Sequence, residues 1–137
     1  MSITTEQREE LVKRARQARR YAYAPYSGYA VGAAVLCESG RIYAGANVEN
    51  AAYPSGICAE RSAAFHAVGE GERRILAVAV ATENGGTPCG SCRQVLSEFG
   101  PEAVVLLVDK AGRVLTETTV SDLLPQAFGP AHLPKKN

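Results

Sequence analysis

Three cysteines and one glutamate are the residues whose types and spacing best suit chemistry. Cys58 is followed two residues later by Glu60, and Cys89 and Cys92 form a Cys-x-x-Cys pair further along the chain. Each group is expected at the start of a helix, where the helix dipole favours thiolates. Three thiolates would leave the fourth position of a zinc ion open to water, which is typical of catalytic rather than structural sites. The spacing therefore predicts a catalytic zinc site.

Glu60 is the predicted proton carrier of this site. At the same helix start as Cys58, its carboxylate can face the water at the metal and move a proton without being a ligand. Zinc-dependent nucleobase deaminases use this combination, including a form with three cysteines. Taken alone, Cys89 and Cys92 would equally fit a thiol redox pair like that of thioredoxin-like proteins. The association with Cys58 and Glu60 favours the metal site.

The fourth cysteine and the histidines are not expected to bind the metal. Cys37 ends an apolar segment and is expected in or beside the core. His66 lies in the middle of a predicted helix and His132 in the C-terminal tail. Three thiolates and one zinc ion leave a net negative charge, so Arg61 and Arg93 are candidates to hydrogen-bond the sulfurs.

Hydrophobic periodicity and turn residues predict the elements that must position these side chains. An amphipathic helix is expected over 5–20, with Thr4 and Gln7 forming a capping box. Helices at 58–68 and 91–99 each precede a strand that is apolar on nearly every residue, as in strands covered on both faces. The expected strands are 29–37, 41–46, 75–82, 103–109 and 113–119, followed by a short helix from Ser121. The fold class expected is α/β: a single three-layer domain whose mixed five-stranded sheet has helices on both faces.

Composition fits one globular domain and excludes several classes of function. The chain has 137 residues, 46% hydrophobic and 21% charged, with a formal net charge of +1. Balanced charge gives no general attraction for nucleic acid or an anionic membrane. No apolar run reaches the roughly 20 residues of a membrane helix, and the N-terminus lacks the apolar core of a signal peptide. A cytoplasmic protein is expected, whose reducing surroundings favour metal-binding thiols over disulfides.

Several blocks of the sequence resemble cytidine deaminases of the short, homotetrameric, zinc-dependent type. The resemblance covers nearly the whole chain and implies a single cytidine/deoxycytidylate deaminase-type domain over 1–137. The zinc blocks are shared by a wider superfamily, whereas the Asn-x-Glu-Asn block is more specific to nucleoside enzymes. The matching blocks are Ala24-Pro25-Tyr26-Ser27 with Val31-Gly32-Ala33, Asn47 to Tyr53, Cys58-Ala59-Glu60-Arg61, Pro88 to Gln94, and Leu123 to Phe128.

The resemblance implies roles at the zinc site and beside the base. Zinc, one per subunit, would be bound by Cys58, Cys89 and Cys92. Glu60 would carry the proton to N3 and to the leaving amine, and with the backbone of Ala59 it would read the pyrimidine edge.

The remaining substrate contacts are also implied by the resemblance. Asn47 and Glu49 would hold the ribose 3′-hydroxyl, and Phe128 would reach into a neighbouring subunit's site. Tyr29 stands where the family commonly has Phe against the base, and its hydroxyl needs a partner. The residues themselves support a free nucleoside over a nucleotide, because a carboxylate accepts a hydroxyl proton and repels a phosphate.

The implied activity is hydrolytic deamination of cytidine and 2′-deoxycytidine to uridine and 2′-deoxyuridine, with release of ammonia, in pyrimidine salvage. Alternatives are a deaminase of aminonucleoside antibiotics of the blasticidin S type and, from another class, a thiol redox protein using Cys89 and Cys92. A purely structural zinc module is a further alternative. The helix at 58–68 is apolar on more than one face, which favours association, and the resemblance implies a homotetramer with shared active sites.

Overall fold

Five strands form one mixed sheet in the computed structural model, which describes residues 3–134. The strands follow the order β2-β1-β3-β4-β5, with β3 and β4 parallel and the other neighbours antiparallel. Their bounds are β1 (Gly32–Cys37), β2 (Ile42–Ala46), β3 (Ile75–Ala81), β4 (Val104–Val108) and β5 (Val114–Thr119). The expected sheet is confirmed. The ends of the predicted 1–137 domain, residues 1–2 and 135–137, lie outside the described residues.

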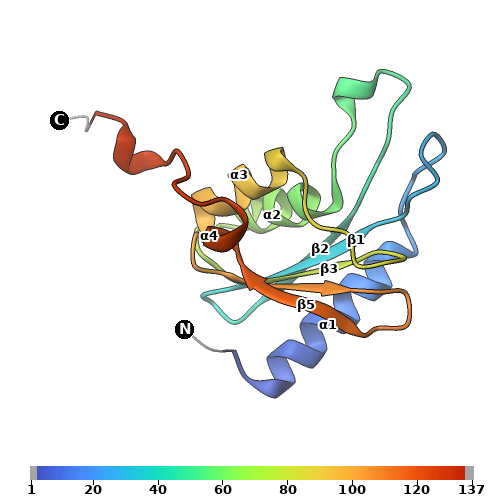
Figure 1. Ribbon diagram of the computed structural model, residues 1–137, viewed down its shortest axis with the longest axis horizontal. Coiled ribbons are helices and arrows are strands. Elements are labelled where there is room, and N and C mark those ends of the chain that lie inside the picture. The colour runs from blue at the N-terminus through green and yellow to red at the C-terminus, as the bar shows by residue number, and fades with distance from the viewer. Residues whose placement is uncertain (1–2, 135–137) are drawn as a thin grey trace.

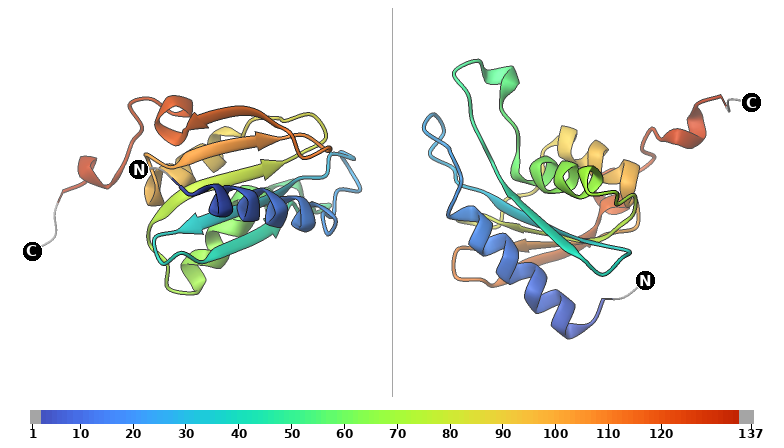
Figure 2. Two further views of the ribbon diagram at one scale, coloured as in Figure 1. Left: turned by 90° about the horizontal axis from the view of Figure 1, so that it is seen from below. Right: turned by 180° about the vertical axis from the view of Figure 1, so that it is seen from behind.

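Helices cover both faces of this sheet (Figures 1 and 2). One face carries α1 (Thr5–Arg19), which begins with the expected Thr4–Gln7 capping box. The other face carries α2 (Ala59–Gly69) and α3 (Gly90–Phe99). The shorter helices are α4 (Val120–Leu123) and two 3₁₀ turns, η1 (Tyr53–Ser55) and η2 (Pro130–His132). Among the described residues, no helix combines the length and apolarity needed to cross a membrane.

Strand alternation divides the core into two layers, because successive side chains point to opposite faces. Side chains that face α2 and α3 include Val35, Cys37, Val78, Val80, Val105 and Leu107. Side chains that face α1 include Ala34, Leu36, Ala77, Ala79, Leu106 and Val108. The three interior strands, β1, β3 and β4, are therefore apolar on both faces, as their sequences indicate.

Strand β1 begins at Gly32, so the expected start at Tyr29 is wrong by three residues. The side chain of Asn47 explains the difference. Its Oδ1 accepts a hydrogen bond from the Val31 amide at 2.9 Å, and its Nδ2 donates to the Tyr29 carbonyl at 2.8 Å. Because a side chain satisfies these two backbone groups, residues 29–31 are not part of the strand.

Four strand ends meet at one edge of the sheet. Gly32 at the start of β1 is paired with Ala46 at the end of β2 and with Ala81 at the end of β3. Ala81 is in turn paired with Val108 at the end of the parallel strand β4. The segments 20–31, 47–58 and 82–89 therefore converge there, and the first two project beyond the sheet in Figure 1. Open α/β sheets commonly bind ligands at this position.

Close packing on β2 fixes α2 relative to this edge. A Cβ placed on Gly45 would lie 2.7 Å from the Ala63 amide nitrogen and 2.6 Å from the Ser62 Oγ. No larger residue fits without displacing the helix. The start of α2 is therefore held against the end of the strand that precedes it.

Candidate active site

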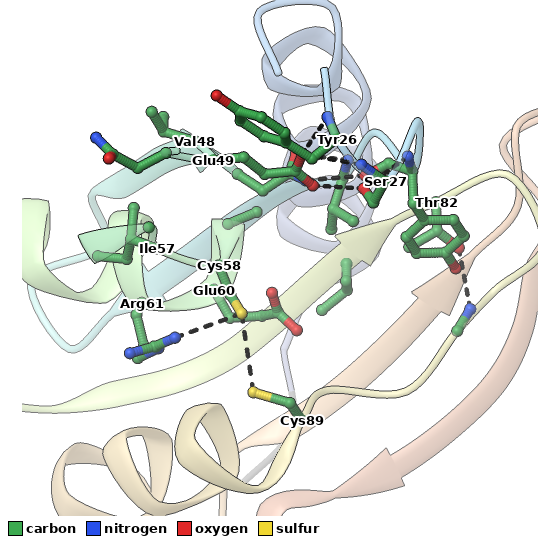
Figure 3. A pocket seen from close by; sticks show the side chains of 18 of the residues that line it. Tyr26, Ser27, Val48, Glu49, Ile57, Cys58, Glu60, Arg61, Thr82 and Cys89 are labelled. Atoms are coloured by element: carbon green, nitrogen blue, oxygen red, sulfur yellow. Dashed lines mark hydrogen bonds between the residues drawn. The ribbon is translucent and has the colours of Figure 1, made fainter. Parts of the chain in front are cut away.

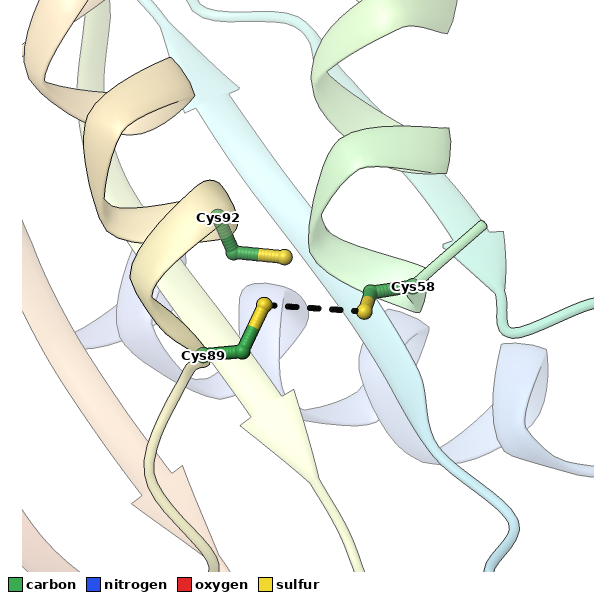
Figure 4. A group of neighbouring side chains, drawn as sticks. All are labelled: Cys58, Cys89 and Cys92. Atoms are coloured by element: carbon green, nitrogen blue, oxygen red, sulfur yellow. Dashed lines mark hydrogen bonds between the residues drawn. The ribbon is translucent and has the colours of Figure 1, made fainter. Parts of the chain in front are cut away.

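Three sulfur atoms converge at the starts of two helices (Figure 4). Cys58 is the N-cap of α2, Cys89 is the N-cap of α3, and Cys92 lies in the first turn of α3. All three sulfurs lie within 4.8 Å of one another, and those of Cys58 and Cys89 are 3.8 Å apart. Cys37 is fully buried at the far end of β1, where burial raises its pKa to about 12.

This sulfur cluster suits a tetrahedral metal ion. Zinc bound to thiolates at about 2.3 Å in tetrahedral geometry places sulfurs about 3.8 Å apart, which is the separation of Cys58 and Cys89. A hydrogen bond from Cys92 and the charge of Arg61 lower the pKa of Cys58. The same interaction with Cys58, together with burial, raises the pKa of Cys92. Full ionisation of the cluster therefore calls for a cation at its centre.

Arg61 is the cation nearest the sulfurs, and it comes from the same helix turn as Cys58. Its Nη2 donates to the Cys58 sulfur at 3.5 Å, whereas its buried Nε has no hydrogen-bond partner among the described residues. Arg93 has a different role. It donates to the carbonyls of Pro88 at 2.8 Å and Leu123 at 2.7 Å, and so holds the backbone beside Cys89.

Glu60 lies beside the sulfur of Cys58 (Figure 3), and its charge also acts on Cys92. Only 5% of the residue is exposed, and this burial raises the pKa of its carboxyl to about 7. Such a group holds or releases a proton near neutral pH. The arrangement of a buried carboxyl next to a metal-binding cluster is therefore suited to general acid–base chemistry.

A cavity of about 520 Å³ opens above these groups. Its walls come from the three converging segments and the start of α2, as the strand ends require. It brings together most of the predicted site residues: Tyr29, Asn47, Glu49, Cys58, Ala59, Glu60, Arg61 and Cys89. Cys92 lies behind this lining, within the sulfur cluster.

Glu49 is the acidic group at the rim of the cavity. Its Oε1 accepts hydrogen bonds from the amides of Tyr26 at 2.9 Å and Ser27 at 3.1 Å, and its Oε2 accepts one from the Ser27 hydroxyl. These bonds lower the pKa of Glu49 and keep it ionised. Asn47, 9% exposed, retains one amide hydrogen and one lone pair beyond its backbone bonds.

Phe128 is the one predicted substrate contact that does not line the chain's own cavity. It is 58% exposed and stacks on His132, while its carbonyl accepts a hydrogen bond of 2.7 Å from Gln94. The segment after α4 extends away from the sheet (Figures 1 and 2). Within the described chain, no contact tests the expected role of Phe128 in a neighbouring site.

Sequence reasoning missed three residues that shape the cavity. Ser27 anchors Glu49, and the buried Thr82 accepts hydrogen bonds from the amides of Gly85 and Gly86 at 2.7 and 2.9 Å. Asn84 accepts a hydrogen bond from the Tyr29 hydroxyl at 2.7 Å and is thus the missing partner of that group. A serine or threonine just before a glycine-rich loop is the only local sign of such bonds.

Comparison with known proteins agrees with this geometry. Residues 5–108 match the family of the cytidine and deoxycytidylate deaminase zinc-binding region. A cytidine deaminase of Sporosarcina psychrophila is 46% identical over 122 residues, covering 88% of this chain and 90% of the relative. One from Mycobacterium tuberculosis is 45% identical over 126 residues, covering 89% and 90%.

The solved structures place the fold in the same group. The crystal structure of cytidine deaminase from Burkholderia pseudomallei superposes with a TM-score of 0.83 at 44% identity, covering 92% of this chain and all of that chain. Fold and sulfur cluster together define a zinc-binding deaminase domain. The chain belongs to the cytidine and deoxycytidylate deaminase family.

The sulfur cluster predicts which cysteines retain zinc. Cys58→Ala removes one of the three expected ligands and is expected to purify with much less zinc than the parent chain, measured by atomic absorption after gel filtration. Cys37→Ala is the matched control, because its sulfur lies in the core away from the cluster, and it should keep its zinc. Full zinc in Cys58→Ala would contradict the assignment, and so would loss of zinc from a folded Cys37→Ala protein.

Proposed function

We propose that this protein catalyses the hydrolytic deamination of cytidine and 2′-deoxycytidine to uridine and 2′-deoxyuridine, with release of ammonia. The observation that carries this proposal is the buried Glu60 carboxyl beside three converging sulfurs, at the base of a cavity with Glu49 at its rim. The relatives in the comparison bear the name cytidine deaminase, which supports the choice of nucleoside.

Cys58, Cys89 and Cys92 would hold one zinc ion per chain, which supplies Lewis-acid activation of the attacking water. Glu60 accepts a proton from this water and delivers it to N3 of the pyrimidine as the water oxygen adds to C4. Glu60 then accepts the remaining proton of the added hydroxyl and transfers it to the exocyclic amine. The C4–N bond breaks, ammonia leaves, and the C4 carbonyl of uridine forms, so that atoms and charge balance.

The rim of the cavity would bind the sugar. Glu49 is ionised and accepts a hydrogen bond from a ribose hydroxyl, and the free amide hydrogen of Asn47 donates to the same oxygen. An ionised carboxylate at this place repels a 5′- or 3′-phosphate. Ala59 and Glu60 at the start of α2 would contact the pyrimidine edge, and the ring of Tyr29 would lie against the base.

The assembly and location follow as parts of the same proposal. Large apolar side chains are exposed at the cavity, on α2 and after α4: Tyr53 at 76%, Phe65 at 48% and Phe128 at 58%. A homotetramer would cover such groups and let Phe128 complete a neighbouring site. The four cysteines are free, and their thiols need reducing surroundings, which supports a cytoplasmic enzyme of pyrimidine salvage.

The first test is ammonia release from cytidine by the purified protein. We expect turnover of cytidine and 2′-deoxycytidine, loss of turnover after a strong chelator has removed the metal, and recovery when zinc is added back. The nucleotide CMP should be a poor substrate because of Glu49. Activity that survives complete metal removal would contradict the proposed mechanism.

The same assay separates the alternatives. A deaminase of aminonucleoside antibiotics would turn over blasticidin S in preference to cytidine. A thiol redox protein would instead reduce a disulfide substrate and need no zinc. Either result, together with no turnover of cytidine, would contradict the proposed function and support the corresponding alternative.

Removal of the Glu60 carboxyl tests its role as proton carrier. Glu60→Ala is expected to lower kcat by about 10²–10⁴-fold, which is the usual contribution of general acid–base catalysis, while zinc content stays unchanged. Glu70→Ala is the matched control, because Glu70 lies at the exposed end of the same helix. Near-normal kcat in Glu60→Ala would refute the proton-transfer role.

Shared active sites predict complementation between two defective chains. Phe128→Ala is expected to lose activity because its neighbour's site lacks an aromatic wall, and Glu60→Ala lacks its proton carrier. Hybrid oligomers from co-expression of the two should be more active than either variant alone, since some sites combine an intact Glu60 with an intact Phe128. Activity limited to the sum of the separate variants, or an active monomer in gel filtration, would show that each site is built from one chain.

A further inference from the structure

The Tyr29 side chain bridges two segments that line the cavity. Its hydroxyl donates to the Asn84 Oδ1 at 2.7 Å, which links residues 24–31 to the loop that follows β3. The Tyr29 backbone is itself fixed on both sides: its amide donates to Ser27 Oγ at 3.0 Å, and its carbonyl accepts from Asn47 Nδ2 at 2.8 Å. The backbone that carries the phenol ring is therefore fixed in position.

The loop at 83–88 is shaped to receive this hydroxyl. Thr82 Oγ1 accepts hydrogen bonds from the amides of Gly85 and Gly86, and Asn84 forms an isolated antiparallel β-bridge with Asp109. A Cβ on Gly86 would lie 2.5 Å from the Tyr29 hydroxyl oxygen but 3.6 Å from its Cζ. Gly86 does not have a positive φ, so a larger residue there would clash with the Tyr29 hydroxyl without straining the backbone.

We propose that Tyr29, Asn84 and Gly86 form a clasp that joins two walls of the cavity and thereby sets the affinity for the nucleoside. The proposal rests on the proposed function and adds Asn84 and Gly86 as positioning residues. The hydroxyl of Tyr29 acts through Asn84 on the loop, whereas its ring faces the cavity. A phenylalanine at position 29 would keep the ring and lose the clasp.

The clasp should affect substrate affinity more than the chemical step. Loop 83–88 continues into Cys89, but Arg93 holds the Pro88 carbonyl at 2.8 Å and the N-terminal turn of α3 holds Cys89. Glu60 belongs to α2 and has no contact with the clasp among the hydrogen bonds of the described residues. Loss of the clasp therefore loosens the wall without moving the sulfurs or the proton carrier.

The test begins with the hydrogen bond. Tyr29→Phe and Asn84→Ala are each expected to raise KM for cytidine about threefold to tenfold, as the loss of one hydrogen bond implies, with kcat and zinc content unchanged. The double variant should match the single variants, because both remove the same bond. Asn84→Asp keeps the acceptor and should keep the parental KM. Tyr43→Phe, which loses a hydroxyl bond to Glu72 outside the cavity, is the matched control.

Gly86 gives a second and sharper test. Gly86→Ala should raise KM in the parent chain, because the new methyl group displaces the Tyr29 hydroxyl. In a Tyr29→Phe background the same substitution meets only an ordinary contact and should cause no further rise. Gly69→Ala, where a Cβ meets nothing, is the control. An equal effect of Gly86→Ala in both backgrounds would overturn the proposal.

Hydrogen exchange of the amides in 83–87 separates this proposal from the proposed function, because it needs no substrate. Faster exchange in Tyr29→Phe and in Asn84→Ala is expected, and unchanged exchange would refute the clasp. Faster exchange with an unaltered KM would refute its link to affinity. Faster exchange in a protein that does not deaminate cytidine at all would refute the proposed function and leave the clasp standing.

Discussion

Three sulfur atoms within 4.8 Å of one another are the constraint on which the rest of this structure depends. Thiolates so close repel each other, and partial burial removes the water that would screen them. Two helix N-termini and the Arg61 guanidinium offset part of this charge, and a divalent cation would offset the remainder. The secondary structure meets this requirement, since each of the three cysteines stands at a helix start.

The sheet makes these helix starts coincide. Strand β3 leads into α3 and then into the parallel strand β4, so the start of α3 lies at the same edge as the ends of both strands. Strand β2 ends at that edge too and leads, through residues 47–58, to α2. Gly45 lets α2 approach the sheet closely. Cys58 therefore lies close to Cys89 although they belong to different helices. The first turn of α2, which follows Cys58, places Glu60 at the base of the cavity.

Much of this could be predicted from the sequence because the signals are local. Apolar runs and turn residues identified every strand and the helices on both faces, and the Cys-x-x-Cys spacing with Cys58 and Glu60 identified the cluster. The start of β1 was misplaced because a distant side chain, Asn47, satisfies the backbone at Tyr29 and Val31. Arg93 illustrates the same limit: its neighbour Cys92 suggested a bond to sulfur, whereas its guanidinium holds two carbonyls, one of them from Leu123. Such long-range hydrogen bonds have no periodic signal in the chain.

The charges in the cavity also bear on the kind of molecule that enters it. Among the described lining residues, Glu49 and Glu60 are the acids and Arg61 is the only cation, and Arg61 is already engaged with Cys58. An anionic ligand would find no free positive charge and would face the ionised Glu49. A neutral nucleoside avoids this repulsion and can donate a ribose hydroxyl to the same carboxylate. The carboxylate proposed to bind the sugar would therefore also exclude its phosphate esters.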